Sequence, residues 1–213
     1  GEIILIVLGI TIALFLKNWN QERANSEIRN GIYTVIVKDL KSDTTSIKKL
    51  IKYYEKIEPE FLKVMNDSLS SESDIFTTLM TSQRLVTLNT RGFNQLSDFR
   101  NSMNNNTDSL TFKINEFYSV FNKKTNDIND RISEDIFEII KDWRDNYSWF
   151  RPVVKSQKAT KEAKPYFIES LEYKNKVTYR HILVYENYIP TLKSFLKNSE
   201  VILNDIDSRL EKR

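Results

Sequence analysis

The sequence contains no cysteine, one histidine, four glycines and four prolines in 213 residues. The absence of cysteine excludes disulfides, thiolate metal sites and a cysteine nucleophile. A single histidine leaves little material for acid–base chemistry near neutral pH. So few glycines and prolines argue against β-sandwiches, barrels and the glycine loops of nucleotide-binding sheets. The composition therefore predicts an all-α, non-enzymatic chain with no cofactor.

The sequence also has no large excess of charge of one sign, because 32 Lys and Arg residues are balanced by 29 Asp and Glu residues. A nearly neutral chain has no strong electrostatic attraction to a polyanion. We therefore expect no nucleic-acid partner.

The most informative stretch is the apolar run from Ile3 to Leu16, which reads IILIVLGITIALFL without a charge. As a helix these 14 residues measure about 21 Å, whereas a bilayer core of about 30 Å needs about 20 residues. By length alone the run is consistent with a membrane span, a buried core helix or a signal peptide.

The surroundings of the run favour a membrane anchor over residues 1–19. The run is apolar on every side except Thr11, whose hydroxyl can bond back to the preceding turn. A cleavable signal peptide would need a small-residue exit, whereas this run ends in Phe15-Leu16-Lys17. Lys17 and Trp19 follow directly, as residues do at a membrane–water interface. Since the chain starts with Gly, we expect the span to continue upstream.

Three residues of the anchor are candidates for packing between helices in the membrane. Gly9 and Ala13 form a small-xxx-small pair, a pattern that lets helices approach closely but also occurs by chance. Glu2 would lie in hydrocarbon if apolar residues precede it, and there it would have to be neutral or paired. The alternative places Glu2 among the lipid headgroups.

Residues 1–14, GEIILIVLGITIAL, closed by Asn18-Trp19-Asn20, resemble the opening of a Bacteroidota family of uncharacterised single-pass membrane proteins. The resemblance weakens beyond the anchor, to Phe93-Asn94-Gln95-Leu96 and the pair Phe117-Tyr118. Phe15-Leu16-Lys17 stands where the family commonly has Gln-Ile-Asn. The resemblance implies a cytoplasmic N-terminus, a periplasmic remainder and a Glu2 within the span. It implies no activity.

A heptad seam follows the anchor and predicts a helical stalk over residues 20–65. Its positions are Tyr33, Ile36, Leu40, Ile47, Leu50, Tyr54, Ile57, Phe61 and Val64. We expect one helix from the membrane to at least Leu50, and a kink or restart at Pro59.

Residues 66–213 are expected to form a helical bundle that packs on this stalk. The pattern predicts a short helix capped by Asp74, a second that starts near Arg91 and ends at residues 104–106, and a long helix capped by Asp108. Residues 151–165 read as a linker or mobile loop. A final seam runs from Ile168 to Leu210, with Pro190 as its weak point.

For the remaining candidate sites, the sequence favours ordinary structural roles over functional ones. His181 lacks the partners of a metal motif and is expected at the surface or in packing. An acidic row on the long helix could bind cations or a basic partner, but is more simply a solvated face; it comprises Asp127, Asp130, Glu134, Asp135, Glu138 and Asp142. Lysines at three-residue spacing could contact phosphates, pair with this row or stay solvated; they are Lys155, Lys158, Lys161 and Lys164. An aromatic group could recognise carbohydrate or peptide, or pack at a helix end; it comprises Trp143, Tyr147, Trp149 and Phe150.

Together these patterns predict an all-α protein in which one N-terminal transmembrane helix continues into an elongated periplasmic helical bundle. The favoured function is a membrane-tethered interaction or scaffold subunit of a bacterial inner-membrane assembly, with a protein partner or a second copy. The alternative is a periplasmic sensor domain that binds a small ligand or partner.

Overall fold

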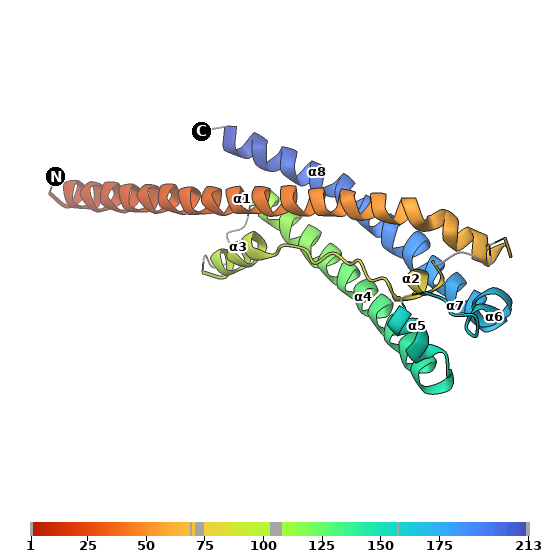
Figure 1. Ribbon diagram of the computed structural model, residues 1–213. Coiled ribbons are helices and arrows are strands. Elements are labelled where there is room, and N and C mark those ends of the chain that lie inside the picture. The colour runs from red at the N-terminus through yellow and green to blue at the C-terminus, as the bar shows by residue number, and fades with distance from the viewer. Residues whose placement is uncertain (1, 69, 71–74, 103–107, 157, 212–213) are drawn as a thin grey trace. The chain divides into compact units, whose positions relative to one another are not determined.

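The computed structural model describes residues 2–68, 70, 75–102, 108–156 and 158–211, and this part of the chain is all-helical, as predicted (Figure 1). The elements are α1 (Glu2–Met65), α2 (Phe76–Thr81), α3 (Arg91–Ser102), α4 (Ser109–Asn146), α5 (Phe150–Ser156), α6 (Lys164–Glu169), α7 (Leu171–His181), the π-helix η1 (Ile182–Tyr188) and α8 (Ile189–Glu211). The expected cap at Asp74 and the helix end at residues 104–106 lie outside the described residues.

The chain divides into two compact units. Unit 1 comprises Gly1–Ser42, Asn89–Tyr118 and Val201–Arg213, and unit 2 comprises Asp43–Leu88 and Ser119–Glu200. The helices α1, α4 and α8 each contribute residues to both units. The division into anchor, stalk and bundle stays a prediction.

Helix α1 confirms the expected continuity and corrects the expectation of a restart at Pro59. It is a single helix of 64 residues that contains Pro59 in its last two turns. Phe61 and Val64, beyond the proline, are only 2% and 3% exposed. Because these side chains are held in the core of unit 2, the helix continues although Pro59 removes one backbone hydrogen bond.

The heptad seam of α1 is buried inside the chain itself. Ile36 and Leu40 are fully buried in unit 1, and Ile47, Leu50 and Tyr54 are buried in unit 2. Association of two copies through this seam would therefore compete with the core of each copy.

In unit 2 a strap without regular secondary structure, residues 82–88, has its backbone polar groups bound by side chains. The Tyr54 hydroxyl donates to the Arg84 carbonyl at 2.7 Å, and the Asn129 amide donates to the Val86 carbonyl at 2.8 Å. The Val86 N–H donates to the Tyr188 hydroxyl at 2.8 Å. These bonds satisfy groups that an extended segment would otherwise leave unpaired.

The expectation of a linker or mobile loop at residues 151–165 is only partly correct. Helix α5 covers the first residues of this stretch, α6 begins at Lys164, and residues 158–163 between them are not helical. Val153, Ala159 and Ala163 are nevertheless buried, in the same core cluster as Trp143 and Phe167. The stretch lacks helical periodicity because its middle is not a helix.

Pro190 does not interrupt the final helical run. Helices α7, η1 and α8 follow one another without a gap from Leu171 to Glu211. The widened turns of η1 end just before Pro190, and the Ile189 N–H bonds to the Val184 carbonyl. A π segment at this place accommodates a residue that lacks an N–H and that crowds the preceding turn.

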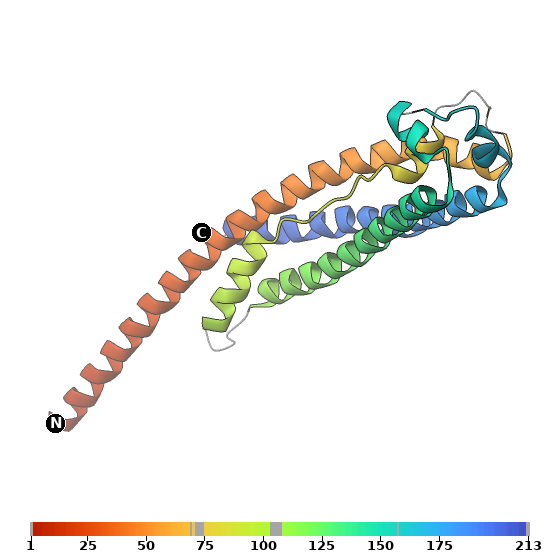
Figure 2. The same ribbon diagram turned by 60° about the horizontal axis from the view of Figure 1, so that its bottom comes forward.

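Figure 2 shows that α4 runs in the direction of α1, and α7–α8 in the opposite direction.

Candidate functional site

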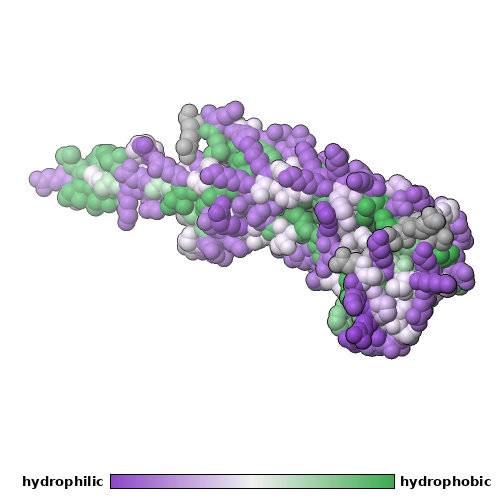
Figure 3. Space-filling model, in the orientation of Figure 1, coloured by the Kyte–Doolittle hydropathy of each residue, from purple (hydrophilic) through white to green (hydrophobic). Residues whose placement is uncertain are grey.

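The first turns of α1 expose large apolar side chains on every side. From Ile4 to Leu16 their exposed fractions lie between 49% at Leu16 and 73% at Leu5. This is the one helix among the described residues that is long and apolar enough to cross a membrane, and no part of its apolar window is buried in the chain. Figure 3 shows the apolar surface at this end of α1. Within the part of the chain that the structure describes, this segment is thus an apolar surface with no partner.

The backbone of this segment is satisfied within the helix, as a lipid environment requires. The one polar side chain of the run, Thr11, donates its hydroxyl hydrogen to the Val7 carbonyl at 2.8 Å, as the sequence predicted. A Cβ atom added at Gly9 would meet nothing within 4 Å. Glu2 and Ala13 are exposed as well. A second helix would therefore find Gly9 and Ala13 accessible, and their packing role stays a prediction.

The helix turns polar directly after Leu16. Lys17 is exposed and Trp19 is 52% exposed. In the following turns Arg23 pairs with Glu27 at 3.3 Å, an interaction between two well-exposed side chains. This change from apolar to polar surface marks where the helix would leave a membrane.

In unit 1 the carboxylate of Asp108 joins residues of three helices. It caps α4 by accepting the Thr111 N–H at 2.8 Å, as predicted, and it accepts the Tyr33 hydroxyl of α1 at 3.1 Å. Arg29 of α1 lies 3.4 Å away and Arg209 of α8 lies 3.3 Å away. The cap was predictable from the sequence. Tyr33, Arg29 and Arg209, the other partners of Asp108, are 75 or more positions away, so no local pattern indicated them.

The surroundings of Asp108 change two pKa values. Partial burial acts to raise the pKa of Asp108, but hydrogen bonds from Thr111 and Tyr33 and the charge of Arg29 outweigh it and lower that pKa below its ordinary value. Burial raises the pKa of Tyr33 to about 12, so this residue remains a hydroxyl donor at neutral pH. The cluster therefore holds a carboxylate between two guanidinium groups and serves to join helices.

An open hollow of about 240 Å³ in unit 1 lies between the first turns of α4 and the end of α8. Its cations are Lys113 and Arg209. Lys113 pairs with Asp205 at 2.8 Å, and Arg209 pairs with Asp108. Because both cations have carboxylate partners, the hollow presents no excess positive charge to an anion.

The aromatic group at the end of α4 is part of the core of unit 2. Trp143 and Trp149 are 2% and 4% exposed and contact each other edge to face. The Trp143 indole N–H donates to the Tyr166 hydroxyl at 3.0 Å, and Tyr147 donates to Glu172 at 2.8 Å. These contacts support packing at a helix end rather than an open aromatic platform for carbohydrate or peptide.

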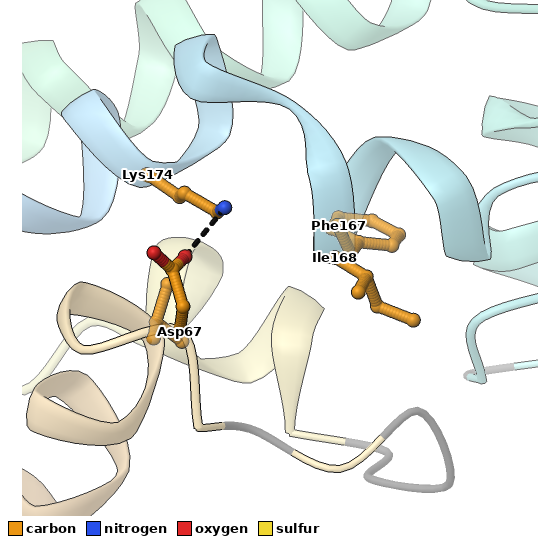
Figure 4. Close-up of a pocket in the computed structure, with 5 residues that line it drawn as sticks. Asp67, Phe167, Ile168 and Lys174 are labelled. Carbon is orange, nitrogen blue, oxygen red and sulfur yellow. Dashed lines mark ion pairs between the residues drawn. The ribbon is translucent and has the colours of Figure 1, made fainter.

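The close-up in Figure 4 shows a small pocket where α1 ends. Asp67 takes a left-handed conformation (φ 55°), and the Ser68 N–H bonds back to the Lys63 carbonyl at 2.8 Å, which closes the helix end. Lys174 pairs with Asp67 at 2.5 Å, and Val64, Phe167 and Ile168 complete the lining. The cavity measures about 30 Å³, which has room for a water molecule but not for a larger ligand.

His181 packs as expected for a structural residue. Its ring lies against Tyr185 with centroids 4.6 Å apart, and its Nε2 lies 3.5 Å from a Glu58 oxygen. Across the described part of the chain, no group of three or more His, Asp or Glu side chains is placed to hold a metal ion.

The acidic row of α4 splits into two sets. Asp127, Asp135 and Asp142 pair with Lys123, Arg180 and Lys176 respectively. Asp130, Glu134 and Glu138 are exposed. Lys155 and Lys161 of the lysine series are exposed too. A spacing of three or four residues identified the row, but only the fold separates its paired members from its solvent-facing ones.

Comparison of the chain with protein-family models, with curated proteins and with solved structures finds no match. The resemblance of the anchor to a membrane-protein family therefore stays a prediction.

Proposed function

We propose that this protein is a non-enzymatic, membrane-tethered interaction or scaffold subunit of a bacterial inner-membrane assembly, with its C-terminal part in the periplasm. The observation that carries the proposal is the apolar start of α1, which is exposed on all sides. The same helix continues without a break and contributes residues to both units.

The physical argument is the cost of leaving this segment in water. Burial of one large apolar side chain is worth about 1.5–3 kcal/mol. Ten such side chains between Ile4 and Leu16 have no partner among the residues that the structure describes. A helix satisfies its own backbone, so a bilayer can take up these side chains without unpaired polar groups.

A tether needs membrane insertion, and insertion is tested by fractionation. The full chain should remain with membranes after extraction at alkaline pH and should be released by detergent. Release by alkaline extraction alone would exclude a spanning helix.

Orientation is tested with single cysteines, because the natural chain contains none. Ser42 and Ser208 are both exposed. Cysteines at these positions should react with a membrane-impermeant maleimide in intact spheroplasts. Protection of both until lysis would reverse the proposed topology.

Glu2 tests whether assembly occurs within the membrane. An ionised carboxyl in hydrocarbon costs at least about 2.5 kcal/mol, so Glu2 in the span would be neutral or paired with another helix. Glu2→Leu should leave the protein in the membrane but lose its partner or its second copy, and Glu2→Gln should retain part of the association. Unchanged assembly of the Leu variant would place Glu2 at the headgroups.

Two of the hollows give the sensor alternative little support. The small pocket beside Lys174 has room for about one water molecule, and the hollow beside Arg209 has its cations paired.

A further inference from the structure

The outward face of α1 in unit 2 is a row of lysines. Lys48, Lys52 and Lys56 are exposed and follow one another at four-residue spacing, so they lie along one side of the helix. Ile47, Leu50 and Tyr54 are buried on the opposite side. We call these three lysines the lysine strip. Glu55, at its edge, pairs with Lys193 of α8 at 3.2 Å and so does not neutralise it.

The outward face of α4 in the same unit is acidic. Asp130, Glu134 and Glu138 are exposed, again at four-residue spacing, and we call them the acidic strip. The buried side of the helix carries Ile132, Ile136 and Ile139. Arg131 and Lys141 border the strip without interrupting its spacing.

The two strips match in geometry and are complementary in charge. In each strip successive charges are about 6 Å apart along the helix, since four residues rise by that amount. Within the described part of the chain, no member of either strip takes part in an ion pair. Each strip is therefore available to a surface of opposite charge with the same repeat.

The strap places both strips at the same level of unit 2. Arg84 accepts a hydrogen bond from Tyr54 of α1 at 2.7 Å, and its neighbour Gln83 donates to Ser133 of α4 at 2.7 Å. Tyr54 lies between Lys52 and Lys56 in the sequence, and Ser133 directly precedes Glu134, the middle residue of the acidic strip. Because α1 and α4 run in the same direction, the strips have the same polarity as well (Figures 1 and 2).

We propose that the lysine strip of one molecule docks on the acidic strip of a second copy of this chain. The proposal rests on the proposed function in one respect: copies anchored in one membrane share an orientation, which brings the two strips to the same height. Exposed ion pairs are individually weak, but tethering in a membrane raises the effective concentration of one copy near another. In a two-fold dimer each copy gives its lysine strip to the acidic strip of the other. Without a two-fold axis, the contact repeats from copy to copy and forms a ring or a row.

The test uses the full chain in membranes and exploits the absence of native cysteine. One tagged copy carries Lys49→Cys and a differently tagged copy carries Arg131→Cys, next to the lysine strip and the acidic strip respectively. A bis-maleimide should link the two copies at low ionic strength and do so less as salt is added. Reversal of the lysine strip (K48E, K52E and K56E) in both copies should lower the linked fraction about tenfold, the combined effect of three exposed pairs. Reversal of the acidic strip (D130K, E134K and E138K) should do the same.

The decisive sample mixes the two reversed variants, lysine-reversed copies with acid-reversed ones. Each then presents charges that complement the other, so linking between them should return to the level of the natural chain. The matched control reverses three other exposed cations of unit 2, Arg151, Lys155 and Lys161, and should leave linking unchanged.

The outcomes separate this proposal from the proposed function. Failure of the mixture to restore linking would overturn docking on a second copy. Reduced linking in the lysine-reversed chain together with normal linking in the acid-reversed chain would overturn it as well, and would indicate that the lysine strip binds a different acidic surface. Vesicle flotation of the same samples tests the membrane anchor independently. A chain that does not float with the vesicles contradicts the proposed tether and leaves the docking of the strips to the linking experiment.

Discussion

The backbone amide of Gly92 donates a hydrogen bond of 2.8 Å to the carboxylate of Asp39, which fixes the start of α3 against α1 in unit 1. The contact is close enough to exclude any side chain at position 92. A Cβ atom there would lie 2.6 Å from Ile36 Cγ1 and 2.8 Å from the Ile36 backbone nitrogen. Arg91 adds an ion pair to Asp39 at 3.5 Å.

Gly92→Ala should therefore destabilise the protein by about 1–3 kcal/mol, the usual cost of overpacking a tight contact. The backbone of α1 would have to move, because one of the clashing atoms, the Ile36 nitrogen, belongs to its main chain. Thermal unfolding of the detergent-solubilised chain, followed by circular dichroism, measures the loss. Gly31→Ala is the matched control: nothing lies within 4 Å of its Cβ position, and alanine in a helix should be neutral or stabilise slightly. Equal melting temperatures for the two variants would contradict the close approach.

Asp108→Asn should remove the charge that joins α1, α4 and α8 while it keeps an acceptor for the Thr111 N–H. We expect a loss of about 1 kcal/mol at neutral pH, since Arg29 and Arg209 would lose their carboxylate partner. The lowered pKa of Asp108 sets the pH dependence: a carboxyl whose pKa is lowered on folding stabilises the fold above its ordinary value of 3.8 and loses this contribution as the pH falls through the lowered pKa. Urea unfolding at several pH values should show the two proteins converging at the acidic end. A difference that is constant with pH would show that the charge of Asp108 is not responsible.

Ile47→Ala tests whether the heptad seam belongs to the core of the chain. Ile47 is fully buried, so truncation should cost about 2–5 kcal/mol and leave the oligomeric state unchanged. Urea unfolding measures the loss of stability, and native mass reports the oligomeric state. A variant that stays fully stable but dissociates would mean that the seam joins two copies.

Asp135→Asn should be strongly destabilising, because it leaves a buried guanidinium without its counter-charge. Arg180 is 2% exposed, and its Nε donates to Asp135 at 2.7 Å. Loss of one partner of a buried pair typically costs about 3–5 kcal/mol. The neighbouring change Glu134→Gln is the control and should be within about 0.5 kcal/mol of the natural chain, since Glu134 is exposed. A difference of less than about 1 kcal/mol between the two variants, measured by urea unfolding, would contradict the role of the pair.

Much of the helical framework was predictable from the sequence. The shortage of glycine and proline and the periodic apolar residues predicted an all-α chain, and the structure confirms this for the residues that it describes. The continuity of α1 past Leu50 and the cap at Asp108 were also predicted correctly. These features depend on residues within one or two turns of each other, which a local pattern reports directly.

The helix restart that the sequence allowed at Pro59 does not occur, for a physical reason. Pro59 and Pro190 both lie within helical runs, because buried neighbours such as Phe61 hold the chain helical on the far side of the proline. Local propensity cannot include the free energy of that tertiary packing.

By itself the sequence determined the apolar start of α1, the all-helical architecture and which side of each long helix turns inward, since these follow from local composition and from a period of 3.6 residues. Only the tertiary structure decided that Val153, Ala159 and Ala163 pack in the core of unit 2, that Asp108 meets Arg29 and Arg209, and that the strap brings Tyr54 and Ser133 to one level. These relationships join residues from tens to more than a hundred positions apart, and no short-range pattern carries them. They form because burial of the shared core first brings the helices together and then leaves each buried polar group to find a partner.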